Sequence, residues 1–277
     1  MAKYGTDTLE PRINRALAEF NLHGVYGNNW SVAEAKRQLI RIGTNPITDT
    51  TRRLVWDVPT VEEVLLKTTD GNLIDTLSGS SALDTTHVFD IYGSYFDAEG
   101  NLMRIVQRVN LDGQNQITLP VPLARVCEVI EIDYDLLVGD VYVYQDTAVT
   151  GGVPNDLTKV AAYVNGSGGR ARSLKAACVT AGDEALVVLG GLMSVNKKQS
   201  VFSTFTLQSR PVDSDTWVTA IGSVTLNSVG TSAIQVDPLV LGVLPPNHDV
   251  RVICDSSASA TPVEVTLMGQ YAKQSSG

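Results

Sequence analysis

The second half of the chain is a succession of short apolar or alternating runs, each ended by polar residues, glycine or proline. The spacing is typical of a β-sandwich or barrel, and about eight such runs match the number of strands in a jelly roll. No catalytic motif lies on any of them, so the pattern favours a domain that packs, binds or assembles. The runs are Lys159–Val164, Arg172–Cys178, Glu184–Leu192, Ser200–Gln208, Thr216–Leu226, Ser232–Val236, Asp249–Cys254 and Pro262–Ala272.

The last of these runs has the clearest period of two. Val263, Val265, Leu267 and Tyr271 fall on one face, and polar side chains such as Thr266 fall on the other. Successive side chains of a strand point to opposite faces of the sheet. We therefore predict a half-buried strand with Leu267 on its inward face.

Residues 51–150 also have strand patterns. Thr86–Phe96 alternates and is joined by the tight connection Asp97–Asn101 to Leu102–Val109, which predicts a hairpin. Glycine and proline then cluster in Thr150–Asn155, between two periodic regions, and this segment is the best candidate for a linker. The sequence thus predicts a first β-sandwich domain over residues 51–150 and a second over residues 151–277.

Residues 1–50 differ from the rest of the chain. Leu9, Ile13, Leu17 and Phe20 recur at spacings of three and four, which predicts an amphipathic helix over Leu9–Leu22. Ser31 and Glu34 form a capping-box pattern ahead of a second helix over Val32–Ile42. Two short helices form little core alone, so we expect either an arm laid against a neighbouring molecule, with the four apolar side chains at the interface, or a lid on the next domain.

Charge and cysteine content exclude several classes of protein. The formal net charge of −9 disfavours direct binding of nucleic acid, because an acidic surface repels phosphates. Cys127, Cys178 and Cys254 are widely spaced, so we expect buried free thiols, no disulfide framework and no zinc site. No secretory leader and no long apolar run is evident, so we expect no membrane association and folding in a reducing cytoplasm.

Candidate catalytic and ligand-binding groups are sparse. The glycine-rich stretch Asn165–Arg170 lacks the Lys-Ser/Thr end of a phosphate loop, and we interpret it as a hairpin tip. His87 lies near Asp84 and Asp90, a grouping that suggests a triad or a metal site, but no nucleophile motif accompanies it. His23 and His248 lie at breaks in the pattern, and nothing ties the three histidines together. We therefore predict that the protein is not an enzyme.

The densest acidic patch comprises Asp133, Asp135 and Asp140, with Glu128 and Glu131 nearby. Its spacing resembles a calcium loop but lacks the glycine and the closing glutamate of an EF-hand. A solvated turn is the simpler interpretation, and a cation clip between strands is the alternative. We expect the protein to need no metal and no other cofactor.

Several turn motifs stand out along the chain: Gly24–Asn28, Asp90–Gly100, Val109–Gln114, Gly139–Tyr144, Gly152–Pro154, Leu207–Pro211 and Leu244–Val250. Together these motifs resemble those of a group of virion structural proteins of tailed bacteriophages. The likeness spans most of residues 20–272, although residues 60–84 contain no matching motif. It implies a place in the virus particle and supplies no catalytic residues.

We therefore expect an all-β protein with two β-sandwich domains, the C-terminal one jelly-roll-like, and a short helical N-terminal arm over residues 1–50. The resemblance implies a capsid decoration or cement protein, made in the host cytoplasm, that packs on or between subunits of the major capsid protein or on other virion proteins. Low surface charge and sheet edges that need covering predict a homotrimer or larger ring. A neck, tail or fibre adaptor is the first alternative. A carbohydrate-binding module that contacts the host surface is the second.

Overall fold

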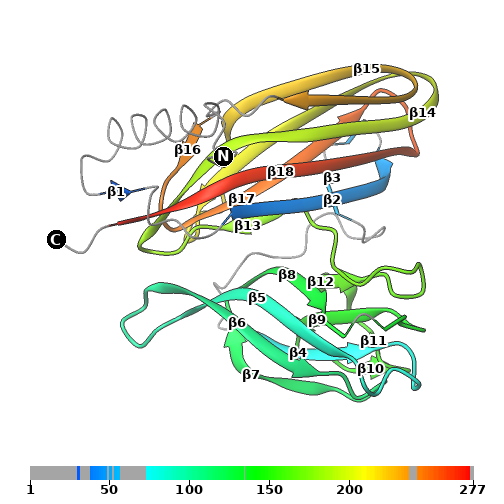
Figure 1. Ribbon diagram of the computed structural model, residues 1–277, viewed down its shortest axis with the longest axis vertical. Helices are drawn as coiled ribbons and strands as arrows, with labels where there is room; N and C mark the ends of the chain where they lie inside the picture. The colour runs from blue at the N-terminus through cyan, green and yellow to red at the C-terminus, as the bar shows by residue number, and fades with distance from the viewer. Residues whose placement is uncertain are drawn as a thin grey trace, which may run out of the picture.

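The computed structural model confirms the all-β class (Figure 1). It describes residues 30–31, 38–48, 50–51, 53–56, 73–133, 135–236 and 242–274. Antiparallel sheets account for the regular structure of these residues, and their one helical element is the short 3-10 turn η1, Leu157–Lys159. The chain forms two bodies, which we name the first and the second sheet assembly.

The first sheet assembly comprises a four-stranded sheet in the order β12-β9-β4-β7, a three-stranded sheet in the order β6-β5-β8, and the β10-β11 hairpin. Alternation on β5 turns Phe89 and Ile91 into a core shared with Leu77, Leu123 and Val143. The predicted hairpin over residues 86–109 is confirmed as β5 and β6. Strand bounds are β4 Ile74–Gly79, β5 Val88–Phe96, β6 Leu102–Asn110, β7 Ile117–Leu123, β8 Arg125–Glu131, β9 Val141–Gln145, β10 Val149–Thr150, β11 Val153–Pro154 and β12 Val160–Val164.

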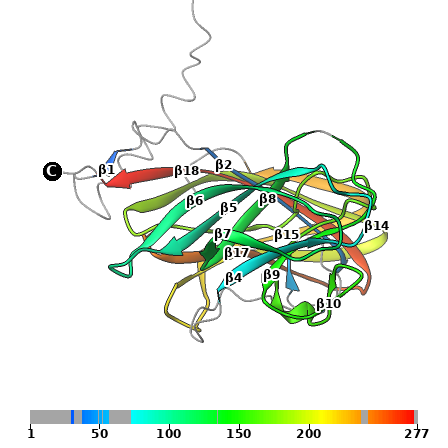
Figure 2. The same ribbon diagram turned by 90° about the horizontal axis from the view of Figure 1, so that it is seen from below.

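The second sheet assembly is one connected nine-stranded sheet, and it lies above the first in Figure 1 and behind it in Figure 2. Its buried side chains form two adjoining clusters, one around Phe205 and Val265 and one around Leu186 and Leu267. Its strands are β1 Trp30–Ser31, β2 Gln38–Thr48, β3 Arg53–Leu54, β13 Ala177–Val179, β14 Glu184–Pro211, β15 Val218–Val236, β16 Gly242–Leu244, β17 His248–Ser256 and β18 Thr261–Gln274.

Two strands of this assembly are much longer than the runs that predicted them. The runs 184–192 and 200–208 are one strand of 28 residues, β14, and the runs 216–226 and 232–236 are one strand of 19 residues, β15. Polar residues between the runs break the apolar pattern without breaking the backbone ladder. Between Lys197 and Val201 the pairing of β14 with β15 shifts register, and it continues on both sides of the shift.

The halves of β14 and β15 pair with different partners. On one side, Glu184–Val195 of β14 pairs with β18, which in turn pairs with β2. On its other side, Gly191–Lys197 of β14 pairs with the second half of β15. Farther along β14, Ser203–Pro211 pairs on one side with β17, which in turn pairs with β13. The other side of this part of β14 pairs with the first half of β15. Two four-strand orders result, β2-β18-β14-β15 and β13-β17-β14-β15, joined through β14 and β15.

The helix predicted over Val32–Ile42 is wrong for its last residues, because Gln38–Ile42 belongs to β2. Pairing of this segment with β18 outweighs its weak local helical signal, as tertiary context often does. Residues 32–37, and the whole helix predicted over Leu9–Leu22, lie outside the described residues. The four apolar arm residues Leu9, Ile13, Leu17 and Phe20 lie outside them as well.

Strand pairing divides the chain differently from the expected boundary near residue 150. The segment expected as a linker contains the β10-β11 hairpin, and β12, beyond it, pairs with β9 of the first sheet assembly. β2 and β3, which precede the first sheet assembly in sequence, pair with β18 and β17 of the second. The first sheet assembly is thus inserted between strands of the second. Glycine and proline content identified a turn at Thr150–Asn155. Whether that turn is a hairpin or a linker depends on which strands pair on either side of it, and the sequence does not show this pairing.

Candidate functional site at the junction of the two sheet assemblies

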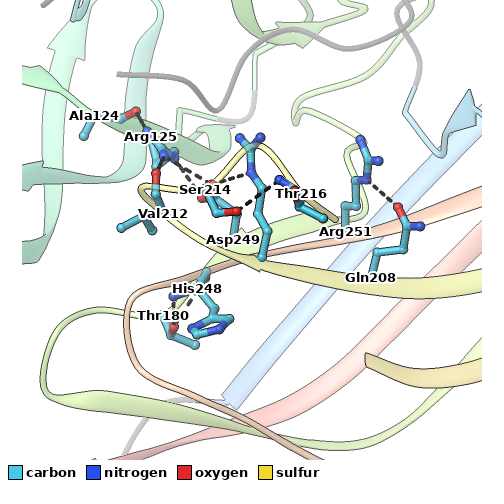
Figure 3. A network of polar contacts seen from close by, with 11 residues as sticks. Ala124, Arg125, Thr180, Gln208, Val212, Ser214, Thr216, His248, Asp249 and Arg251 are labelled. Carbon is cyan, nitrogen blue, oxygen red and sulfur yellow. Dashed lines mark hydrogen bonds and ion pairs between the residues drawn. The ribbon is translucent and has the colours of Figure 1, made fainter. Parts of the chain in front are cut away.

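A buried ion pair joins the two sheet assemblies (Figure 3). Arg125, the first residue of β8, points its guanidinium at Asp249 of β17, with Nε 2.7 Å from Oδ1 and Nη2 3.1 Å from Oδ2. Both side chains are fully buried. Arg125 also donates to the carbonyl oxygens of Ala124 at 2.8 Å and Val212 at 3.2 Å. The two-pronged geometry fixes the direction of approach as well as the contact.

A second arginine shares the same carboxylate. Arg210 of β14 places its Nε 3.2 Å from Oδ2 of Asp249 and its guanidinium 4.6 Å from the centre of the Trp217 ring. Arg251 stacks on the same ring at 3.9 Å, and burial lowers the pKa of Arg251 to about 10. Such cation–π stacking stabilises guanidinium groups that have left water. The buried carboxylate of Asp249 therefore pairs with two arginines, and one of them, Arg210, shares the Trp217 ring with Arg251.

Arg104 of β6 forms a second polar link across the junction. It forms an ion pair with Glu184 at the start of β14, donates to the carbonyl oxygen of Val179 at 2.6 Å, and lies 3.5 Å from the centre of the Tyr271 ring. A small apolar cluster of Leu102, Ala124, Cys127 and Val179 fills the space between the two assemblies near these charges. The junction therefore combines directional contacts with apolar packing.

Lys175 lies in the segment that crosses from the first sheet assembly to the second. Its Nζ donates to the carbonyl oxygen of Ala161 at 2.9 Å and lies 5.4 Å from the centre of the Trp56 ring. Burial lowers the pKa of Lys175 to about 8, because removing an ammonium group from water disfavours its charged form. The crossing segment is thus held by contacts with both assemblies.

The histidine grouping predicted from sequence is only partly brought together. His87 lies between two buried carboxylates, with Nε2 3.6 Å from Oδ1 of Asp84 and Nδ1 3.6 Å from Oε1 of Glu131. Asp90 instead forms an ion pair with Arg108 on the surface. His248 is far along the chain on β17, where its Nδ1 is 2.8 Å from the carbonyl oxygen of Pro246. His23 lies outside the described residues.

The acidic patch is divided among internal contacts. Asp140 accepts hydrogen bonds from the Tyr163 hydroxyl at 2.9 Å and the Ser167 hydroxyl at 2.7 Å, while Glu128 forms an ion pair with Arg172. Oε1 of Glu131 accepts from the amide of Asp133 at 3.0 Å. Within the described part of the chain, no group of three or more histidine, cysteine or acidic residues is arranged to hold a metal ion.

The glycine-rich stretch over residues 165–170 is a turn at the start of the crossing segment, not the hairpin tip expected. β12 ends just before it, and the next strand, β13, belongs to the other assembly. The amide of Ser167 donates to Oδ1 of Asp140 at 3.1 Å, and the amide of Gly168 donates to the side chain of Asn165 at 2.8 Å. A carboxylate at this turn repels phosphate. The three cysteines are buried free thiols, as expected.

One hollow lies beside the junction contacts, and another lies within the second sheet assembly. A cleft of about 460 Å³ at the junction is lined by Phe96 and Asn101 from the first assembly and by Asp213, Asn247 and His248 from the second. Asn247 has a φ of 55°, an unusual value for a residue other than glycine. A smaller apolar cavity of about 170 Å³ lies inside the second assembly, between β14, β15 and β18.

The buried Arg125, Asp249 and Arg210 are the junction residues that the sequence reasoning missed. The available signal was a charged residue inside an apolar run, as in Ala124–Ile130 and Asp249–Cys254. Charged side chains are almost never fully buried unless they are paired. That signal predicts a pair for each residue but does not say which partner completes it.

Comparisons with known proteins give no family assignment. No family model matches the chain, and no curated protein matches it. Among solved structures, the T13 viral particle of IBDV is 10% identical, with 97% of this chain and 82% of that chain covered at a TM-score of 0.20. The VP2 subviral particle of infectious bursal disease virus is 9% identical, with 86% and 77% covered at a TM-score of 0.19. This similarity to proteins of viral particles is too weak to support an argument about fold or function.

No helix among the described residues is long and apolar enough to cross a membrane.

Proposed function

We propose that this protein is a non-catalytic structural component of a bacteriophage virion, a capsid decoration or cement protein. The observation that carries the proposal is the junction. The fully buried Arg125–Asp249 pair ties two all-β assemblies together. Several of the groups that suggested chemistry contact their own chain: Asp84 lies beside His87, Asp140 accepts a hydrogen bond from Ser167, and Glu128 forms an ion pair with Arg172. A rigid junction of this kind suits a structural protein that holds neighbouring subunits together better than it suits an enzyme.

We further propose that the second sheet assembly is a jelly roll. The order of strand pairing supports this. The two four-strand orders, β2-β18-β14-β15 and β13-β17-β14-β15, match two interlocked Greek keys in which β14 and β15 each contribute one half to each order. The jelly roll is common in capsid and lectin domains, so the fold is compatible with the proposed role without establishing it.

The decisive experiment is to count copies of the protein per purified particle against the major capsid protein, by quantitative mass spectrometry. A decoration protein follows the symmetry of the shell and is expected at hundreds of copies. A count of about a dozen would assign the protein to a neck or tail ring, the first alternative. Absence from the particle would refute the proposal.

Attachment by the N-terminal arm is part of the proposal. Deletion of residues 1–23 is expected to leave both sheet assemblies folded and to weaken binding to the particle, because the apolar residues Leu9, Ile13, Leu17 and Phe20 are too few to form a core alone. Circular dichroism and co-sedimentation with particles that lack the protein measure the two effects. Unfolding of the truncated protein would mean that the arm belongs to the internal core.

A carbohydrate-binding role is the second candidate, and the junction cleft favours it. Phe96 is 39% exposed at this cleft, and Asn101, Asp213, Asn247 and His248 provide polar groups around it. An aromatic face beside polar side chains suits a sugar ring. Binding to a glycan array that is lost in Phe96→Ala and retained in Leu83→Ala, an exposed residue elsewhere, would support this role.

A further inference from the structure

Most edge strands of the two assemblies carry features that discourage pairing with another chain. β7 contains Pro120 and Pro122, β6 contains Arg104 and Arg108, and β2 contains Arg41 and Pro46. β12 and β13 are short, with 5 and 3 residues. Proline, charge and brevity are the devices by which sheet edges avoid aggregation.

β15 is the exception. It is 19 residues long, and it contains neither a charged residue nor a proline. Within the described residues β15 pairs only along one edge, with β14, and Figure 1 shows it at the outer limit of the second sheet assembly. Two irregularities interrupt this pairing, one where Leu207 and Gln208 oppose Gly222 and Thr219 and one where Lys197 and Val201 oppose Gly230 and Ser228. From Gly222 to Val236 the strand runs on, so a long row of backbone groups faces away from β14.

We propose that this edge pairs with the same edge of a second copy, with the two β15 strands antiparallel about a twofold axis. The inference rests on the homo-oligomer expected from the sequence, and it names the surface that would form the contact between copies. Antiparallel pairing of identical strands is isologous, so one edge supplies both halves of the contact.

Charge and length favour a second copy as the occupant. Each chain has a net charge of −9, so most surfaces of one copy repel the same surface of another copy. β15 carries no charged side chain, so two copies of this strand do not repel each other in this way. A strand of similar length is needed to satisfy the whole edge, and a second β15 provides it when the two strands are centred on the twofold axis. Such a contact gives a dimer in solution, or a hexamer if the expected threefold contact also forms.

The test places like charges on the proposed contact. Thr225 and Asn227 are exposed on β15, so Thr225→Lys combined with Asn227→Lys leaves the core intact. Lysines brought together across the twofold axis are expected to weaken dimerisation by about tenfold or more. The matched control is Thr118→Lys, an exposed threonine of the proline-containing edge strand β7, which should leave the dissociation constant unchanged.

Sedimentation velocity of the purified full-length protein over a concentration series measures the effect. A dimer or hexamer that the double lysine variant dissociates supports the inference. A monomer or a trimer alone at all concentrations, or an assembly that tolerates both lysines, overturns it.

Hydrogen exchange of the unmodified protein gives an independent measurement that does not depend on a variant folding. Amides of residues 222–236 should exchange more slowly at high concentration than at low concentration, whereas amides of β7 should not change. Equal exchange at both concentrations while a dimer forms would place the contact elsewhere and overturn the inference. Because neither measurement uses particles, a virion role can fail while the contact stands, and the reverse also holds.

Discussion

The two sheet assemblies differ in how far along the chain their paired strands lie. In the first, β5 and β6 are a hairpin joined by a short turn, and every strand lies within residues 74–164. In the second, β2 pairs with β18, so that Thr48 bonds to Thr261, 213 positions away. Non-local pairing incurs a larger loop-closure cost before any contact forms. The first assembly can therefore form from its own segment, while the second needs residues from both sides of the first.

The largest expected effect comes from breaking the junction that joins the two assemblies. Asp249→Ala leaves Arg125 buried without its counter-charge, and we expect a loss of about 3–5 kcal/mol in the free energy of unfolding. Asp90→Ala, which breaks the exposed Asp90–Arg108 pair, is the control and should cost under about 1 kcal/mol. Urea unfolding measures both. If the two substitutions cost the same, the junction does not couple the assemblies.

A pair of core substitutions asks whether the assemblies unfold together. Leu77→Ala in the first and Leu267→Ala in the second each remove a buried side chain, and each should cost about 2–5 kcal/mol. Thr266→Ala, on the opposite face of β18, should cost far less. Calorimetry is the measurement. A coupled molecule loses stability in one common transition, whereas two separate transitions, each lowered by its own substitution, would show independent assemblies.

A smaller effect tests whether β2 closes the second assembly as its pairing implies. A Cβ atom added at Gly43 would lie 2.3 Å from the carbonyl oxygen of Val55 and 2.6 Å from Ala176, so Gly43→Ala should cost about 1–3 kcal/mol. Gly100 has a positive φ of 84° but open space around it, so Gly100→Ala should cost only about 1 kcal/mol, from backbone strain. Equal thermal shifts for the two variants would argue against close packing of β2.

The smallest effect is the pH dependence that Lys175 confers on the crossing segment. Its pKa falls from 10.5 to about 8 on folding, so above pH 8 the unfolded chain binds more protons and stability rises with pH. Burial raises the pKa of Cys254 from 9.0 to about 12, which opposes this trend from pH 9 upward. Between pH 7 and pH 9 the unmodified protein should therefore gain about 1 kcal/mol relative to Lys175→Met in urea unfolding. An unchanged difference would show that burial does not neutralise Lys175.

Sequence by itself determined the all-β class, the hairpin around Asp97–Asn101 and the facing of the last strand, where Val263, Val265 and Leu267 are buried as predicted. Each of these features is encoded in neighbouring residues, through a turn or a period of two. Tertiary structure alone decided that Gln38–Ile42 is a strand, that two pairs of runs are the continuous strands β14 and β15, and that Arg125 meets Asp249. Those outcomes depend on partners far away in the chain, and a local pattern of side chains carries no information about which distant strand completes its backbone hydrogen bonds or which buried charge balances its own.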